Sequence, residues 1–181
     1  MLKAPEVSSV NAGAAKRDAL HEHPQDPMTL KQGDDAPDFH VSSSDGRALR
    51  LADFHGKKNI VLYFYPADFT GVCTRETCGF RDMYDDLASK DTEVIGVSFD
   101  DDATHERFRK EHGVQFALVA DTNKELAKRY GATSFFSKLI GKASRVTYVI
   151  DKNSRIAGVF QAEISAKTHL EGVRDLLARL S

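Results

Sequence analysis

The feature that most constrains the fold of this chain is the heptapeptide Asn59–Tyr65, in which every residue after the first is aliphatic or aromatic. The run is apolar at both odd and even positions, so neither face of the strand that it predicts can point to water. We therefore expect a strand in the middle of a sheet, with other elements packed on both sides. A chain of 181 residues can bury such a sheet in one core without metals or disulfides.

Strands and helices alternate along the rest of the chain. Residues 39–41 and 48–51 flank a Ser-Asp-Gly turn and predict an N-terminal β-hairpin. Residue patterns predict helices over 70–89, 102–112, 124–130 and 166–180, and strands over 93–99, 115–121, 145–151 and 155–161. The last two strands pair as a second hairpin. This order indicates an α/β fold with a central mixed β-sheet that is flanked by helices on both faces.

The N-terminal part of the chain differs from the rest. Residues 1–28 contain three of the five prolines and show no sustained strand or helix period. We expect a flexible N-terminal arm over 1–28 and one domain over 29–181. An apolar cluster within 135–140 has three possible roles. It can belong to the core, cover a functional site, or form a contact between subunits.

Charge and composition exclude several classes of function. The formal net charge is −2, so no basic field favours nucleic acid as a partner. No run approaches the ~20 apolar residues that a membrane span needs, and the N-terminus lacks the apolar core of a secretion signal. The two cysteines are too few for a disulfide framework, and their close spacing indicates redox chemistry or no role at all. A reduced, cytoplasmic setting is therefore expected.

The segment with the clearest chemical potential follows the apolar strand. Ligands usually bind beyond the carboxyl ends of strands in α/β sheets, and Cys73 falls there, in the first turn of the next expected helix. Unpaired backbone N–H groups and the positive end of the helix dipole favour thiolate over thiol at this position. Thr70 can cap the helix or donate its hydroxyl to a bound oxygen. Pro66 cannot extend the strand ladder, so it helps to end the strand and to shape the wall around the sulfur.

The second cysteine, Cys78, lies five residues after Cys73. On an intact helix the two Cα atoms would be separated by a rise of about 7.5 Å and would lie roughly 8.7 Å apart on different faces. A disulfide tolerates at most about 7 Å between its Cα atoms. If both cysteines act, the helix must therefore unwind locally before the two sulfurs can join.

The run P-x-x-x-T-x-x-C, formed by Pro66, Thr70 and Cys73, resembles the active-site signature of the peroxiredoxins. The four-residue gap to Cys78 is similar to that of the subfamily called bacterioferritin comigratory protein or PrxQ. This resemblance implies a thioredoxin-like fold and a thiol-dependent peroxidase that uses neither cofactor nor metal. It also implies that Cys73 is the peroxidatic cysteine and Cys78 the resolving one. Thr70 and Arg145, the latter in an R-x-T-Y-V-I-D segment, would hold and polarise the peroxide.

The same resemblance implies the partners. These are hydrogen peroxide or an organic hydroperoxide as substrate, and thioredoxin or a similar dithiol protein as reductant, with the enzyme a monomer or weak homodimer. One local departure is Gly71-Val72, where the subfamily usually has Pro-Gly. Glu76 is open to two roles, because it can steady Arg145 or favour the first helical turn.

Two other functions compete with a peroxidase. A dithiol–disulfide oxidoreductase normally uses C-x-x-C, whose shorter gap lets the sulfurs meet without helix melting, so the spacing here counts against it. A peroxide-sensing redox switch is compatible with the unwinding that a bond between these two cysteines requires.

Overall fold

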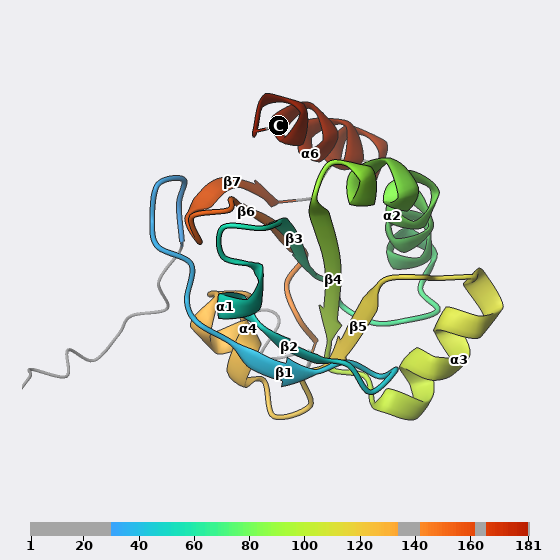
Figure 1. The fold of residues 1–181 in the computed structure, drawn as a ribbon. Coiled ribbons are helices and arrows are strands. Elements are labelled where there is room, and N and C mark those ends of the chain that lie inside the picture. The colour runs from blue at the N-terminus through green and yellow to red at the C-terminus, as the bar shows by residue number, and fades with distance from the viewer. Residues whose placement is uncertain (1–29, 134–141, 162–165, 181) are drawn as a thin grey trace, which may run out of the picture.

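The structure is a computed structural model that describes residues 30–133, 142–161 and 166–180. The expected arm over 1–28 and the apolar cluster within 135–140 lie outside the described residues. The elements, in chain order, are β1 (His40–Ser42), β2 (Ala48–Arg50), α1 (Leu51–Phe54), β3 (Asn59–Phe64), α2 (Gly71–Ser89), β4 (Thr92–Ser98), α3 (Asp102–His112), β5 (Ala117–Ala120), α4 (Glu125–Arg129), β6 (Val146–Ile150), β7 (Ile156–Gln161) and α6 (Ala166–Leu180). Figure 1 shows these elements around a central sheet.

The apolar run forms the central strand of that sheet, as predicted. The strand order is β5-β4-β3-β6-β7, and all six residues of β3 are buried. β3 pairs in parallel with β4 and antiparallel with β6, which makes the sheet mixed. Parallel β3 and β4 end at the same edge, so the segment after β3 lies beyond their carboxyl ends.

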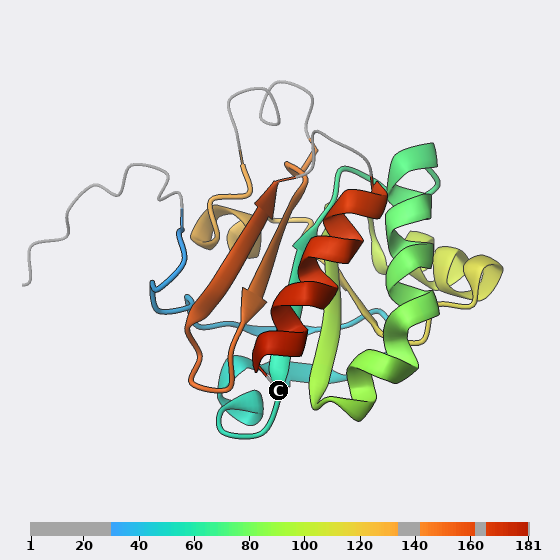
Figure 2. The same cartoon turned by 90° about the horizontal axis from the view of Figure 1, so that it is seen from above.

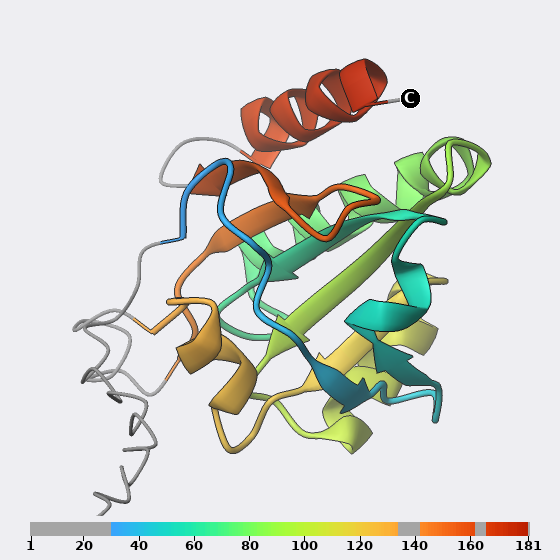
Figure 3. The same ribbon diagram turned by 60° about the vertical axis from the view of Figure 1, so that its left-hand side comes forward.

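The two faces of β3 contribute to two separate hydrophobic clusters. Ile60, Leu62 and Phe64 belong to one cluster, together with apolar side chains from α4 and the hairpin. The alternate β3 residues belong to the other, which includes side chains from α2, α3 and α6. Figure 2 shows α2 and α6 side by side across one face of the sheet, and Figure 3 shows the hairpin and α4 on the opposite face. Helices therefore cover both faces, as predicted.

The N-terminal hairpin is confirmed, but its second strand is shorter than predicted. β1 and β2 pair antiparallel with Val41 opposite Leu49. The chain leaves the extended conformation after Arg50, and Leu51 begins the short helix α1, which the sequence did not predict. The reason is that four helical residues are too few to show an i, i+4 apolar repeat.

The other predicted elements agree with the structure to within a few residues at their ends. α3 begins at 102 as predicted, because the Asp101 carboxylate accepts a hydrogen bond from the Thr104 backbone N–H at 2.8 Å. α4 begins one residue late, since Lys124 adopts a left-handed backbone conformation. α6 spans 166–180 as predicted and buries Val173 and Leu177 against the sheet. Within the described part of the chain, no helix is long and apolar enough to cross a membrane.

Candidate active site

Cys73 lies in the first turn of α2, where the sequence placed it, but its side chain is buried. The residue is 1% exposed and packs in the hydrophobic cluster beneath α2. The position of Cys73 in the first helical turn does not predict this burial, which results from the packing of α2 against the sheet. In the structure both cysteines are free thiols on one continuous helix.

Arg145 reaches the sulfur from the strand next to β3. It precedes β6, which is paired with β3. Its Nη2 donates to Cys73 Sγ at 3.1 Å, although 72 positions separate the two residues in the chain. A guanidinium is always charged and is a strong donor, so this contact can stabilise negative charge on the sulfur.

Glu76 fixes Arg145 in this position, which decides between the two roles that the sequence left open. The Glu76 carboxylate accepts a hydrogen bond from Arg145 Nη1 and is 1% exposed. Burial raises the pKa of Glu76, and the Arg145 charge opposes that rise. Because Nη1 is bound to Glu76, Nη2 of the same planar group remains directed at the sulfur.

The C-terminal helix adds a histidine to this cluster. His169 Nε2 lies 2.7 Å from Thr147 Oγ1 and 3.6 Å from Glu76 Oε1. Burial, with a smaller contribution from Arg145, lowers the pKa of His169 to about 4. A neutral His169 therefore packs against the buried carboxylate. No pattern in the sequence indicated this contact, because it joins helices that are distant in the chain.

Thr70 and Pro66 occupy the positions that the sequence predicted, with one difference in detail. Tyr65 N donates to Val97 O at 3.0 Å as the last sheet bond of this strand, and Pro66 follows it with no N–H to continue the ladder. Thr70 is the residue before the first turn of α2, but its side chain does not cap the helix. Its Oγ1 instead donates to Ala67 O at 3.1 Å. The lone pairs of this hydroxyl point to no helix N–H.

Cys78 lies about one and a half turns after Cys73 on α2 and is half-buried. It lines a groove of about 560 Å³ between α2 and α6, whose apolar wall includes Val72, Met83 and Leu170. The intact helix holds Cys78 apart from Cys73, which agrees with the need for local unwinding. Val72, next to the buried cysteine, is 42% exposed.

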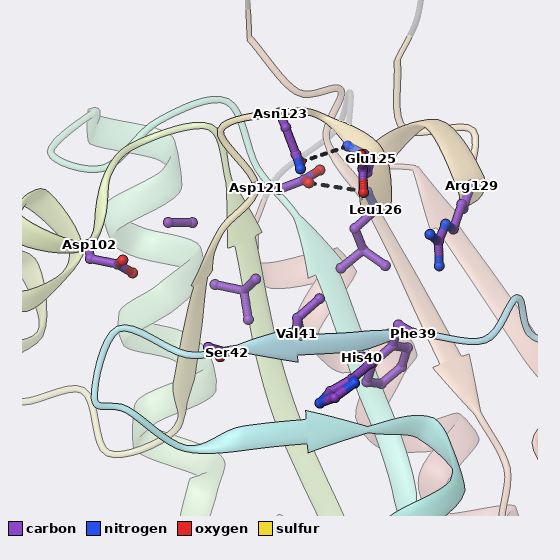
Figure 4. Close-up of a pocket in the computed structure, with 12 residues that line it drawn as sticks. Phe39, His40, Val41, Ser42, Asp102, Asp121, Asn123, Glu125, Leu126 and Arg129 are labelled. Carbon is purple, nitrogen blue, oxygen red and sulfur yellow. Dashed lines mark hydrogen bonds between the residues drawn. The ribbon is translucent and has the colours of Figure 1, made fainter.

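A second pocket lies away from these residues. It is formed by β1, the end of β5 and the start of α4, and has a volume of about 270 Å³ (Figure 4). Asp121 lies in it, and its carboxylate accepts hydrogen bonds from the backbone N–H groups of Leu126 and Ala127. Neither cysteine nor Arg145 lines this pocket, so it is separate from the site around Cys73.

Comparison with known proteins assigns the chain to a family. The sequence profile of the AhpC/TSA family matches residues 32–159. The chain belongs to the AhpC/TSA family. Its relatives identify the branch: peroxiredoxin Q of rice (Oryza sativa subsp. japonica), described as chloroplastic, is 36% identical over 152 residues, which span 83% of this chain and 68% of the relative.

Peroxiredoxin Bcp of Bacillus subtilis is 34% identical over 157 residues, which span 85% of this chain and 99% of that protein. The crystal structure of peroxidoxin BcpB from Mycobacterium tuberculosis is similar with a TM-score of 0.76 and 28% identity, over 84% of this chain and 99% of that one. The resemblance to the PrxQ and Bcp peroxiredoxins, and the thioredoxin-like fold that it implied, are confirmed. This member of the AhpC/TSA family is a thiol-dependent peroxidase.

Proposed function

We propose that Cys73 attacks the peroxide, that Cys78 resolves the product, and that thioredoxin or a similar dithiol protein recycles the enzyme. The substrates are hydrogen peroxide and organic hydroperoxides. The observation that carries this proposal is the 3.1 Å contact between Arg145 Nη2 and Cys73 Sγ. It places a permanent cation and a directed donor where a thiolate and a departing oxygen need them.

In the first step, the Cys73 thiolate forms a bond to one peroxide oxygen while the O–O bond breaks. The sulfur is oxidised to a sulfenic acid, and the second oxygen leaves with the bonding electron pair and takes up a proton to become water or an alcohol. Arg145 stabilises the charge on the departing oxygen, and Thr70 supplies a hydroxyl for a hydrogen bond to the peroxide. Pro66 ends the strand ladder and helps to shape the wall around the sulfur. A buried sulfur suits a small substrate, since few water molecules compete for the same donors.

In the second step, the Cys78 thiol attacks the sulfenic sulfur of Cys73 and water leaves. The two residues then form a disulfide within one chain, for which the first turns of α2 must unwind. A reductant dithiol afterwards attacks this disulfide, forms a mixed disulfide and leaves as its own disulfide, which restores both thiols. The groove between α2 and α6 keeps Cys78 partly accessible for this exchange.

The site chemistry favours the peroxidase over a general dithiol–disulfide oxidoreductase, because the intact helix separates the two sulfurs. We also propose a reduced, cytoplasmic setting and a monomer or weak homodimer, which fit two free cysteines in a compact domain. Nucleic acid and membranes are not proposed as partners, since the near-neutral chain offers no basic field for either.

The decisive experiment is a peroxidase assay coupled to thioredoxin and its reductase. Wild-type protein should consume hydrogen peroxide and an alkyl hydroperoxide, whereas Cys73→Ser should show no turnover above background. Both proteins should have the same circular dichroism spectrum, which excludes misfolding as the cause. A Cys73→Ser protein with wild-type turnover would refute the assignment. Wild-type activity with another dithiol but not with thioredoxin would refute only the choice of reductant.

A further inference from the structure

The loop between β3 and α2 contains a backbone conformation that needs support from its surroundings. Phe69, directly before Thr70, has a φ of 57° in the left-handed region, which side chains of its size rarely adopt. Its ring is 42% exposed, so burial of that ring does not by itself explain the conformation. The support must therefore come from neighbouring groups that hold the loop on either side.

Helix α3 provides contacts to this loop at two consecutive residues. The Phe69 ring packs edge-on against Phe108 of α3, with ring centroids 5.1 Å apart. His105, one turn earlier on α3, lies with Nδ1 2.7 Å from Asp68 Oδ2. Both the His105 and the Asp68 side chain have no exposed surface. A buried polar contact in a low-dielectric environment is directional, so it fixes the loop more firmly than apolar packing does.

Asp68 is held from three sides. Its Oδ1 accepts a hydrogen bond from Tyr65 Oη at 2.7 Å, and its backbone N–H donates to Asp100 Oδ2 at 2.8 Å. Asp100 also accepts a hydrogen bond from Ser98 Oγ, at the end of β4. The loop is therefore connected to β3, to the end of β4 and to α3 through one residue, which lies two positions before Thr70.

The chemistry of the pair identifies which ring nitrogen of His105 matters. An ionised carboxylate can only accept, so the hydrogen of His105 that faces Asp68 must be on Nδ1. The other ring nitrogen, Nε2, is buried and has no hydrogen-bond partner among the residues that the structure describes. His105 therefore supplies a single useful donor, at the δ position of its side chain.

We infer that His105 is a positioning residue for the peroxide reaction. It acts through Asp68 to hold the Thr70 hydroxyl in a fixed position relative to Cys73 and Arg145. This inference rests on the proposed function, because alignment of Thr70 matters only if a peroxide binds there. His105 does not touch the reacting atoms. Its effect should appear in a reaction that needs Thr70 and should be absent from one that needs the Cys73 thiolate alone.

A matched pair of amide substitutions tests this directly in the full-length reduced protein. His105→Asn keeps an N–H donor at the δ position, where Asp68 is, whereas His105→Gln moves the donor to the ε position, where no partner lies. Two second-order rate constants are measured for Cys73 at one pH: reaction with hydrogen peroxide by stopped flow, and alkylation by iodoacetamide by mass spectrometry. Displacing a reacting group by about 1 Å can reduce a rate about 100-fold.

We expect His105→Gln to react with peroxide about 10- to 100-fold more slowly than wild type, with no decrease in alkylation. His105→Asn should stay within about threefold of wild type in both reactions. His105→Leu, which has no donor, should repeat the selective loss and covers the case in which the glutamine folds back to Asp68.

Three results would overturn the inference. They are donor-free variants that retain the wild-type peroxide rate, an equal loss in both reactions, and an asparagine variant as slow as the leucine variant. If a variant has a lower melting temperature and its peroxide rate is unchanged, the first of these results applies and His105 has a structural role only. If the wild-type protein fails to react with peroxide, the proposed function itself fails, which the wild-type measurement reveals before any variant is compared.

Discussion

At the scale of single residues, Arg145 contacts two different partners with the two ends of one guanidinium. Nη2 is directed at Cys73 Sγ while Nη1 is bound to the buried Glu76 carboxylate. A lysine ammonium is a compact point charge on a flexible stem and cannot reproduce this planar, two-sided geometry. The position therefore requires arginine and not merely a positive charge.

We predict that Arg145→Lys lowers the second-order rate constant for peroxide reduction about 100-fold, the usual effect of removing one oriented donor at a developing negative charge. Stopped-flow measurements at pH 7 check this. Arg50→Lys is the control, because Arg50 is exposed and pairs with Asp53 on the surface. An Arg145→Lys enzyme with a rate within threefold of wild type would show that charge alone suffices.

His169 gives the cluster a defined dependence of stability on pH. Its pKa is lowered from 6.5 to about 4, first by burial and second by Arg145. Between these two values the unfolded chain takes up a proton that the folded protein does not. The folded protein therefore loses stability as the pH falls from about 6.5 to about 4, and the full shift corresponds to about 3 kcal/mol.

We predict that His169→Gln, which cannot take up that proton, flattens this part of the stability profile. Urea unfolding of both proteins from pH 7 to pH 4 should show wild type losing about 3 kcal/mol more than the variant. His55→Gln, on the surface, should follow wild type. Parallel profiles for wild type and His169→Gln would contradict the prediction.

The residues that the sequence could identify are those that lie in a local motif, either the P-x-x-x-T-x-x-C run or the segment that begins with Arg145. Pro66, Thr70 and Cys73 lie within eight positions, and the spacing of side-chain types in that run already indicates their chemistry. The pair of Asp68 and His105 spans 37 positions, and no spacing in the chain indicates their contact. The burial of Cys73 also escaped prediction, because it depends on packing between elements and not on position within a helix.

At the scale of elements, α2 determines how the two cysteines are used. The helix is continuous from 71 to 89, and both cysteines lie in its first half. Between them, Glu76 is bound to Arg145 and Thr77 Oγ1 lies 3.1 Å from the buried Tyr63 hydroxyl. Joining the sulfurs therefore requires the release of both side-chain contacts as well as several backbone hydrogen bonds.

We predict that Cys78→Ser consumes the first equivalent of peroxide but does not turn over with thioredoxin, with a steady-state rate at least about 10-fold below that of wild type. Without a resolving thiol, the sulfenic acid at Cys73 meets further peroxide and becomes a sulfinic acid. Intact-mass spectrometry should show this added mass in the variant and a disulfide within one chain in wild type. Normal cycling of Cys78→Ser would make the second cysteine dispensable.

Periodicity found the longer elements because they are amphipathic or fully buried. α6 shows a repeating apolar face and β3 is apolar after its first residue, and both were predicted nearly to the residue. α1 was missed because it has four residues, and its start depends on a tertiary hydrogen bond from Leu51 N to Phe39 O. Short elements of this kind are determined by their neighbours and not by their own sequence.

At the scale of the whole molecule, oxidation should change the free energy of unfolding of the domain. Whether it rises or falls depends on the energy gained from the disulfide and the energy lost with the side-chain contacts. A disulfide that closes a loop this short stabilises a protein by about 2 kcal/mol. Breaking the buried Arg145–Glu76 pair costs about 3–5 kcal/mol, and losing the Tyr63–Thr77 hydrogen bond about 1 kcal/mol more. The losses exceed the gain, so the disulfide form should be less stable than the reduced form by about 2–4 kcal/mol.

The last prediction follows from this difference and from where the losses occur. The melting temperature of the disulfide form should lie about 5–10 °C below that of the reduced form, for a domain of this size. Amide hydrogen exchange should become faster over 71–78 and remain slow near Phe80 and Leu87, which anchor the rest of α2 in the core. The reduced Cys78→Ser protein provides the reference for an intact helix. If the disulfide form melts higher than the reduced form and exchange over 71–78 is unchanged, the two sulfurs join without unwinding α2.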